Sequence, residues 1–314
     1  MSTYVMGVDF GSTTGKTVIL DGEGAQVAAC VSQKGTVSSE GAQASIAGAL
    51  EQAGITQAEV AFTVSTGYGR RMLDVSDRSF TEITCHARGA VELYPDVRLV
   101  IDIGGQDSKV IAIDDQGLVK QFAMNDRCAA GTGKFFEVLA RAMELPIEEL
   151  GPMALTAEEQ IVVSSMCATF AETEVVSLMA EGKSKKDILF GVHAAVAKRT
   201  SGMVARVGKA EPAVMTGGVA KNVAAVRHIE DALGITLRIP DAPQLAGALG
   251  AALFALDEVR SQARIAEEQE PGEEIAGDDR PACRTGCGTN PSAVATVTGV
   301  ALPMATRDLV RPAG

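Results

Sequence analysis

The stretch that decides the fold is Met6–Val18, which reads MGVDFGSTTGKTV, because a second copy of it follows later in the chain. Val100–Ile111 reads VIDIGGQDSKVI and matches the first stretch at a constant offset of 93 residues, which aligns Asp9 with Asp102. An internal repeat of this kind indicates duplicated domains. Each copy predicts a strand, a glycine-rich turn and a second strand, so the chain is expected to contain two related α/β lobes.

The pattern around the two hairpins predicts the remaining elements. Further strands are expected over residues 26–31, 60–65, 119–124, 161–163, 213–215 and 236–239. Helices are expected over residues 41–53, 82–94, 185–207, 219–233 and 244–264, and after each of two cysteines, Cys128 and Cys167. We place the lobe boundary near Pro95, with a first lobe over 1–95, a second lobe, which contains both cysteine-linked helices, over 96–265, and an acidic, flexible tail over 266–314.

Composition excludes several classes of protein. The 314 residues carry a net charge of −12 and contain 4% aromatic residues with no Trp, which argues against nucleic-acid binding. The start of the chain lacks a basic leader, and the longest apolar run, Leu245–Leu256, is too short to span a bilayer. We therefore expect a cytoplasmic protein without a membrane segment, whose six cysteines are reduced, catalytic or metal-bound.

The glycine-rich turns predict phosphate binding, although Gly11–Thr17 is not a P-loop. Its glycines are one residue too close, and Lys16 is followed by a strand pattern where a P-loop lysine would open a helix. Two Asp-x-Gly hairpins remain, at Asp9 and Asp102, together with a third turn at Gly217-Gly218. Backbone N–H groups and hydroxyls of such turns can hold a polyphosphate, and the two carboxylates can hold Mg²⁺ through water.

Cys128 and Cys167 share a local pattern, because each stands just before a predicted helix. Most free cysteines are small buried hydrophobic residues, and that interpretation remains open for each one alone. Two thiolates are too few for a four-cysteine cluster, so a cluster would need ligands from a second chain. A Cys-x3-Cys pair, Cys283 and Cys287, is a weak metal signal in the acidic tail.

Six segments together resemble the ATPase component of the benzoyl-CoA reductase and 2-hydroxyacyl-CoA dehydratase family. The resemblance covers about residues 4–256 and is carried by Gly7–Thr14, Ser65–Arg70, the Asp102 repeat, Asn125–Lys134, Ser164–Glu174 and Thr216–Asn222. It implies a duplicated actin/hexokinase/Hsp70-like (ribonuclease H-like) fold with two lobes.

The resemblance also implies a set of site residues. Catalytic roles are expected for Asp9, Asp102 and Gln106, with the two aspartates on Mg²⁺ through water. ATP or ADP is expected to bind at Gly11, Ser12, Thr13, Thr14, Gly15, Lys16, Gly104, Gly105, Gln106, Gly217, Gly218 and, at the adenosine end, Gln244. Cys128 and Cys167 are the expected ligands of a [4Fe-4S] cluster that bridges two subunits.

The implied function is ATP-dependent transfer of a low-potential electron. The expected partners are a second copy or a paralogous ATPase subunit, an acyl-CoA reductase or dehydratase component, and ferredoxin or flavodoxin as electron donor. His86–Gly89 favours a benzoyl-CoA reductase subunit slightly, and a separable homodimeric activator of a 2-hydroxyacyl-CoA dehydratase is the alternative. A small-molecule kinase of the same fold and an ATP-sensing module are the more distant alternatives.

Overall fold

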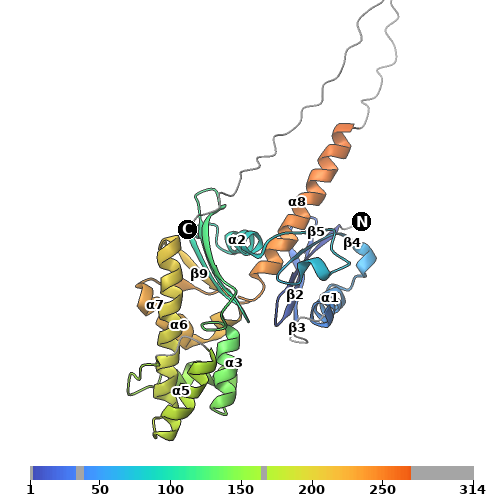
Figure 1. The fold of residues 1–314 in the computed structure, drawn as a ribbon. Helices are drawn as coiled ribbons and strands as arrows, with labels where there is room; N and C mark the ends of the chain where they lie inside the picture. The colour runs from blue at the N-terminus through green and yellow to red at the C-terminus, as the bar shows by residue number, and fades with distance from the viewer. Residues whose placement is uncertain (1–2, 33–38, 164–167, 270–314) are drawn as a thin grey trace, which may run out of the picture. The chain divides into compact units, whose positions relative to one another are not determined.

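The structure is a computed structural model that describes residues 3–32, 39–163 and 168–269, and the statements below refer to these residues. Ten strands form two five-stranded sheets (Figure 1). The first sheet has the order β3-β2-β1-β4-β5, with β1 (Tyr4–Phe10), β2 (Gly15–Asp21), β3 (Gln26–Ser32), β4 (Val60–Thr66) and β5 (Arg78–Ser79). The second has the order β10-β9-β6-β7-β8, with β6 (Leu99–Ile103), β7 (Ser108–Ile113), β8 (Val119–Asn125), β9 (Ala213–Thr216) and β10 (Leu237–Arg238).

The two sheets repeat one topology. In each, a central strand runs antiparallel to the strand that follows it and parallel to a later strand. The register of both hairpins is also the same, since Asp9 pairs with Lys16 and Asp102 pairs with Lys109. The duplication predicted from the sequence is therefore present at the level of strand order and register.

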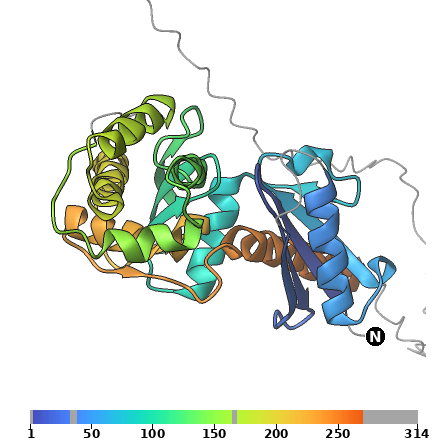
Figure 2. The same cartoon turned by 90° about the horizontal axis from the view of Figure 1, so that it is seen from below.

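Eight α-helices cover the sheets in the described part of the chain. They are α1 (Ser39–Ala53), α2 (Glu82–Leu93), α3 (Gly133–Ala142), α4 (Leu150–Ala154), α5 (Ala168–Ala180), α6 (Lys185–Val207), α7 (Val223–Leu233) and α8 (Ala246–Gln269). Figure 2 shows α1 and α8 on either side of the first sheet. Along β1, Met6 and Val8 pack with α1, whereas Val5 packs with α8, as expected from the alternation of side chains along a strand.

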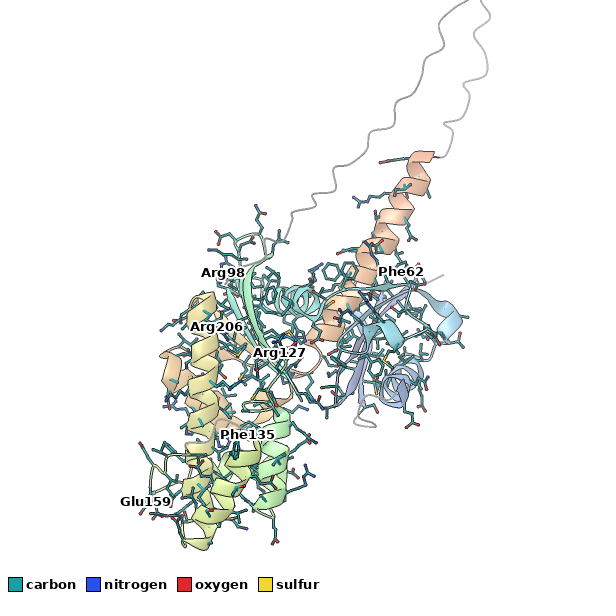
Figure 3. All side chains as sticks on the ribbon, viewed as in Figure 1. Phe62, Arg98, Arg127, Phe135, Glu159 and Arg206 are labelled. Carbon is teal, nitrogen blue, oxygen red and sulfur yellow. The ribbon has the colours of Figure 1, made fainter. Side chains whose placement is uncertain are left out.

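The second sheet is also covered on both faces. Val100 and Val214 pack against α2 on one face, and Ile101 and Met215 belong to the larger core that α3, α5, α6 and α7 build on the other. Phe135, on α3, is fully enclosed in that larger core (Figure 3). This packing fixes α3 against the sheet that carries the second hairpin.

Helices α2 and α8 cross at very short distance. A Cβ added to Gly89 of α2 would lie 1.9 Å from the carbonyl oxygen of Ala246, and one added to Gly250 of α8 would lie 1.8 Å from that of Cys85. Only glycine permits such an approach. Helix α8 thus packs against the first sheet and against α2, although we expected it in the second lobe. Helix α2 in turn contacts the second sheet.

Two local predictions differ from the structure. Residues 161–163 are not a strand, because the run packs against α6, where a Cβ on Gly191 would lie 2.2 Å from the carbonyl oxygen of Ile161. The helix expected over 219–233 begins only at Val223, after Asn222 caps it by accepting hydrogen bonds from two backbone N–H groups. The residues before it form a 3-10 turn over Gly218–Lys221.

Within residues 3–32, 39–163 and 168–269, no helix is long and apolar enough to cross a membrane. The predicted acidic tail lies almost wholly outside the described residues, as do Cys283 and Cys287.

Candidate active site

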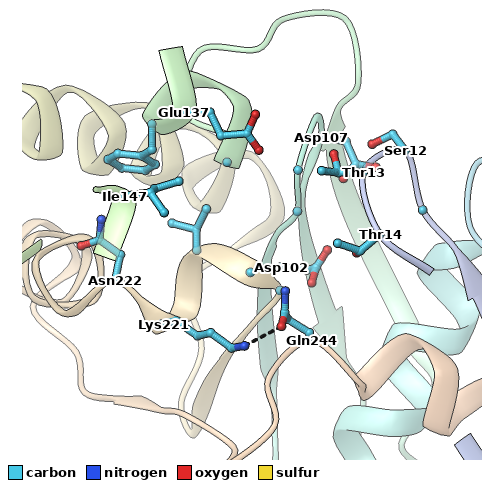
Figure 4. Close-up of a pocket in the computed structure, with 18 of the residues that line it drawn as sticks. Ser12, Thr13, Thr14, Asp102, Asp107, Glu137, Ile147, Lys221, Asn222 and Gln244 are labelled. Carbon is cyan, nitrogen blue, oxygen red and sulfur yellow. Dashed lines mark hydrogen bonds between the residues drawn. The ribbon is translucent and has the colours of Figure 1, made fainter. Parts of the chain in front are cut away.

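The hairpin turns of both sheets open into one cleft of about 770 Å³ (Figure 4). One end of the cleft carries the hydroxyls of Ser12, Thr13 and Thr14 and the carboxylates of Asp102 and Asp107. Ile147 and Asn222 lie towards its other end (Figure 4), and the apolar side chains of Phe136 and Val219 also line the cleft. A cleft that combines carboxylates and hydroxyls with apolar side chains fits a ligand that has both a charged group and a ring.

Most of the residues predicted for nucleotide binding line this cleft. They are Asp9, Gly11, Ser12, Thr13, Thr14, Lys16, Asp102, Gly104, Gly105, Gly217, Gly218 and Gln244. Gly15 is not among them, because it packs under α1, where an added Cβ would lie 2.4 Å from the carbonyl oxygen of Gly41. Gln106 also lies outside the lining, exposed in the turn between β6 and β7.

The first hairpin presents an ion pair to the cleft. Lys16 Nζ donates to Asp9 Oδ2 at 3.0 Å, and both side chains are largely buried. Gly67, which follows β4, has a φ of +89°, and a Cβ there would lie 2.5 Å from Asp9 Oδ1. A glycine is therefore needed beside this carboxylate.

The second hairpin presents the equivalent carboxylate with more partners. Thr216 Oγ1 donates to Asp102 Oδ1 at 2.9 Å, His86 Nδ1 lies 3.5 Å from the same oxygen, and Lys109 Nζ lies 3.3 Å from Oδ2. Burial alone would raise the pKa of Asp102, but His86, Lys109 and Thr216 outweigh it and lower the pKa to about 2. Asp102 is thus an ionised carboxylate held in a fixed orientation.

Gly217 beside Asp102 repeats the arrangement of Gly67 beside Asp9. Its φ is +85°, and a Cβ there would lie 2.9 Å from Asp102 Oδ1. Each glycine directly follows the strand that lies parallel to the aspartate's strand. The duplication therefore extends to the glycines that hold the two carboxylates, a point that the sequence analysis missed for Gly67.

A buried lysine, Lys109, joins three carboxylates at the second hairpin. Besides Asp102, its Nζ contacts Glu82 Oε2 and Asp107 Oδ2, each at 2.8 Å. Although burial opposes the shift, these three carboxylates raise the pKa of Lys109 above its ordinary value. Burial raises the pKa of Glu82 as well, and Lys109 only partly offsets that effect.

The cleft is also lined by four residues that were not predicted as site residues from the sequence, namely Glu82, His86, Asp107 and Lys109. The repeat itself contained a signal for Lys109, because the offset that aligns the two aspartates also aligns Lys16 with Lys109. No such signal marks Glu82 and His86, which reach the cleft only because α2 docks on the second sheet.

Gln244 accepts a hydrogen bond from Lys221 Nζ at 2.6 Å (Figure 4). Gln244 lies near the third glycine turn, since a Cβ on Gly218 would lie 3.3 Å from its Nε2. The predicted adenosine-end residue and the predicted glycine turn are therefore neighbours in the structure.

Cys128 lies away from the cleft lining, in the loop before α3, as a half-buried free thiol. Its carbonyl oxygen accepts from Asn125 Nδ2 at 2.8 Å, and Asn125 Oδ1 accepts from Arg199 of α6 at 3.1 Å. Cys167 lies outside the described residues, so its distance from Cys128 is not given by the structure.

Helix α3 connects this loop to the cleft. Its first two residues, Gly133 and Lys134, donate their backbone N–H groups to the carbonyl oxygens of Gly104 and Gly105, at 2.8 and 2.7 Å. The N-terminus of α3 is thus bonded to the turn of the second hairpin. A shift of that turn would move α3 and the Cys128 loop with it.

Comparison with known proteins decides the family. Residues 6–255 match the BadF/BadG/BcrA/BcrD ATPase family. The chain belongs to this family. This match confirms the family that the sequence motifs predicted, and it confirms that the chain is an ATPase of this family.

Relatives of this BadF/BadG/BcrA/BcrD-type ATPase include proteins of both expected kinds. The activator of lactoyl-CoA dehydratase from Anaerotignum propionicum is 45% identical over 254 residues, which is 81% of this chain and 98% of that protein. A benzoyl-CoA reductase subunit from Thauera aromatica is 32% identical over 278 residues, 85% of this chain and 98% of that protein.

A solved structure of similar sequence is the activator of the 2-hydroxyisocaproyl-CoA dehydratase from Clostridium difficile with bound ADPNP. It is 40% identical, has a TM-score of 0.80 and covers 83% of this chain and 97% of its own. Together with the repeated sheet topology, this likeness confirms the predicted two-lobed actin/Hsp70-like fold.

Proposed function

We propose that this chain is the ATP-dependent activator of a 2-hydroxyacyl-CoA dehydratase, which couples ATP hydrolysis to delivery of an electron. The relatives support the activator because the dehydratase activator is 45% identical to this chain, whereas the reductase subunit is 32% identical at similar coverage. The slight preference for the reductase subunit, based on His86–Gly89, is corrected accordingly.

The observation that carries the ATPase part is the pair of Asp–Lys hairpins that face one cleft. Backbone N–H groups of the glycine turns and the hydroxyls of Ser12, Thr13 and Thr14 are suited to bind a polyphosphate. Carboxylate oxygens are the ligands that Mg²⁺ prefers, and Asp9 and Asp102 place such oxygens at this end. Mg²⁺ would supply charge neutralisation of the phosphates there.

Asp102 is the better candidate for orienting the attacking water. Thr216, His86 and Lys109 surround it, so its carboxylate has a fixed direction and stays ionised. Lys16 places an ammonium group next to the phosphate end, where negative charge develops during phosphoryl transfer. The apolar side chains of Phe136 and Ile147 suit the base.

The path from the nucleotide to the electron-transfer site runs through α3. A nucleotide that contacts Gly104 and Gly105 would act on the carbonyl groups that hold the first turn of α3. The loop before α3 contains Cys128. Hydrolysis can thereby alter the position of this cysteine without any contact between the nucleotide and the thiol.

Cys128 and Cys167 are the proposed ligands of a [4Fe-4S] cluster shared with a second copy of the chain. The half-buried, unpaired thiol of Cys128 fits a ligand role, and the two cysteines of one chain supply half of a four-cysteine set. When bound, the cluster would supply one-electron transfer. A paralogous second subunit, ferredoxin or flavodoxin as donor and a cytoplasmic location stay predictions.

Anaerobic purification of a Cys128→Ser variant tests this assignment. We expect the wild type to be brown and to hold four irons per two chains, on the order of one cluster per dimer. The variant should lose the iron and the electron delivery but still bind ATP, because Cys128 is not among the residues that line the cleft. The matched control is Cys30→Ser, another half-buried free cysteine, which should keep its iron. Full iron in Cys128→Ser would refute the ligand assignment.

A further inference from the structure

His86 is a buried imidazole for which this structure provides no hydrogen-bond partner at one nitrogen. It lies in the second turn of α2, is 6% exposed and lines the cleft. Its Nδ1 is buried and has no hydrogen-bond partner among the described residues, although Asp102 Oδ1 is only 3.5 Å away. A buried polar atom without a hydrogen-bond partner is rare in folded proteins and calls for an explanation, of which a role in catalysis is one.

The other side of the same ring faces the first sheet. A Cβ added to Gly247 of α8 would lie 2.9 Å from His86 Nε2 and 3.2 Å from Asp9 Oδ2. The imidazole thus occupies the space between the two equivalent carboxylates, Asp102 of β6 and Asp9 of β1. No other described histidine lines this cleft.

Charged groups from several elements surround the ring. Glu82 lies one turn earlier on α2 and contacts Lys109 of β7 at 2.8 Å, while Lys16 of β2 is paired with Asp9. Lys109 Nζ forms an ion pair with Asp102 Oδ2, and Thr216 Oγ1 donates a hydrogen bond to Asp102 Oδ1. One more donor on Oδ1 would complete the set of contacts that fixes the plane of this carboxylate.

We propose that His86 is a positioning residue for hydrolysis, whose Nδ1–H donates to Asp102 Oδ1 when the cleft holds a nucleotide. The contact fixes the carboxylate that orients the attacking water, and the ring sets the spacing between Asp102 and Asp9. The inference rests on the proposed ATPase function. It assigns His86 no contact with the substrate.

Three substitutions of His86 separate the roles of its two nitrogens. His86→Asn keeps an amide N–H near the place of Nδ1, His86→Gln keeps one near the place of Nε2, and His86→Leu keeps neither. We expect kcat for ATP hydrolysis to fall roughly 10- to 100-fold in the Leu and Gln variants, as for loss of one hydrogen bond to a charged group. The KM for Mg·ATP should stay within about threefold, and the Asn variant should keep most of kcat.

Gly247→Ala perturbs the ring without replacing it, which keeps the inference testable if a His86 variant fails to fold. The added methyl would press on His86 Nε2 and would also approach Asp9 Oδ2 to 3.2 Å, so kcat should fall. His228→Leu is the matched control, because His228 lies outside the cleft lining, and its kcat should match the wild type.

Equal kcat losses in the Asn and Leu variants would overturn the inference, because the ring would then act only by filling space. A His86→Leu kcat within twofold of the wild type would overturn it as well. A wild-type protein that binds ATP without hydrolysing it would instead overturn the proposed function and, with it, this inference.

Discussion

At the scale of single residues, the site depends on two aspartates in equivalent places but unequal surroundings. Asp9 has one lysine partner, whereas Asp102 contacts a lysine, a threonine and a histidine. The common geometry follows from the duplication, whereas the additional partners of Asp102 come from β9, through Thr216, and from α2, through His86. Because Asp102 has more partners than Asp9, we assign control of the attacking water to Asp102.

Replacing Lys109 by Met should destabilise the protein by about 3–5 kcal/mol, because three carboxylates would lose their buried cation. Urea unfolding of the anaerobically purified protein measures the change. Lys183→Met removes an exposed ion pair with Glu159 and is the control, for which we expect no measurable change. Equal stability of the two variants would show that Lys109 is not the counter-ion of this cluster.

Asp102 should make stability depend on pH in the acid range. Its folded pKa of about 2 lies below the ordinary value of 3.8, so its contribution is present above about pH 4 and is lost as the pH falls toward 2. The loss should amount to about 2 kcal/mol. Unfolding free energies measured from pH 5 to pH 2 should fall more steeply for the wild type than for Asp102→Asn, and parallel curves would contradict the assignment.

Local sequence was sufficient to predict the residues of the hairpins, but it did not predict that His86 and Glu82 of α2 would lie beside them. Asp9, Asp102 and the glycine turns sit in a repeated pattern of strand and turn, which is readable over a dozen residues. His86 and Glu82 reach the site through packing of α2 on a sheet formed by later residues. Tertiary contacts of that kind leave no periodic signal in the sequence.

At the scale of elements, the crossing of α2 and α8 joins the two sheets. Helix α8 packs on the first sheet, α2 packs on α8 and on the second sheet, and glycines line the crossing. Sequence periodicity predicted both helices but grouped α8 with the second lobe, since a helix pattern does not state which sheet it covers. We propose a division of the lobes along the two sheets, with α8 counted in the first.

Gly89→Ala should therefore destabilise the protein by about 1–3 kcal/mol or more, because its Cβ would collide with the backbone of α8. Gly202→Ala is the matched control on α6, where an added Cβ meets nothing within 4 Å. That variant should gain about 0.5–1 kcal/mol from reduced backbone entropy of the unfolded chain. Thermal unfolding distinguishes the two, and a harmless Gly89→Ala would mean that the helices separate easily.

The strand predicted over residues 161–163 shows where element prediction is weakest. A short run of β-branched residues satisfies the pattern of a strand, but here it packs against α6 instead of joining a sheet. Short apolar runs do not distinguish these outcomes by periodicity.

At the scale of the whole molecule, helix α3 connects the nucleotide cleft to the loop that contains Cys128. Gly104 and Gly105 hold the start of α3, and the loop that contains Cys128 leads into it. The proposed activator thus needs no direct contact between nucleotide and metal centre, because the turn of the second hairpin transmits the change. Sequence indicated both sites but not the hydrogen bonds that connect them.

The most direct test of this account measures electron delivery to a 2-hydroxyacyl-CoA dehydratase component, with and without ATP. The reduced, anaerobically purified protein is mixed with the dehydratase, and reduction of the dehydratase is followed spectroscopically. We predict reduction only when ATP is present, and strongly slowed reduction by the Asp102→Asn variant at unchanged iron content. Equal reduction of the dehydratase without ATP would contradict the claim that the cleft controls electron transfer.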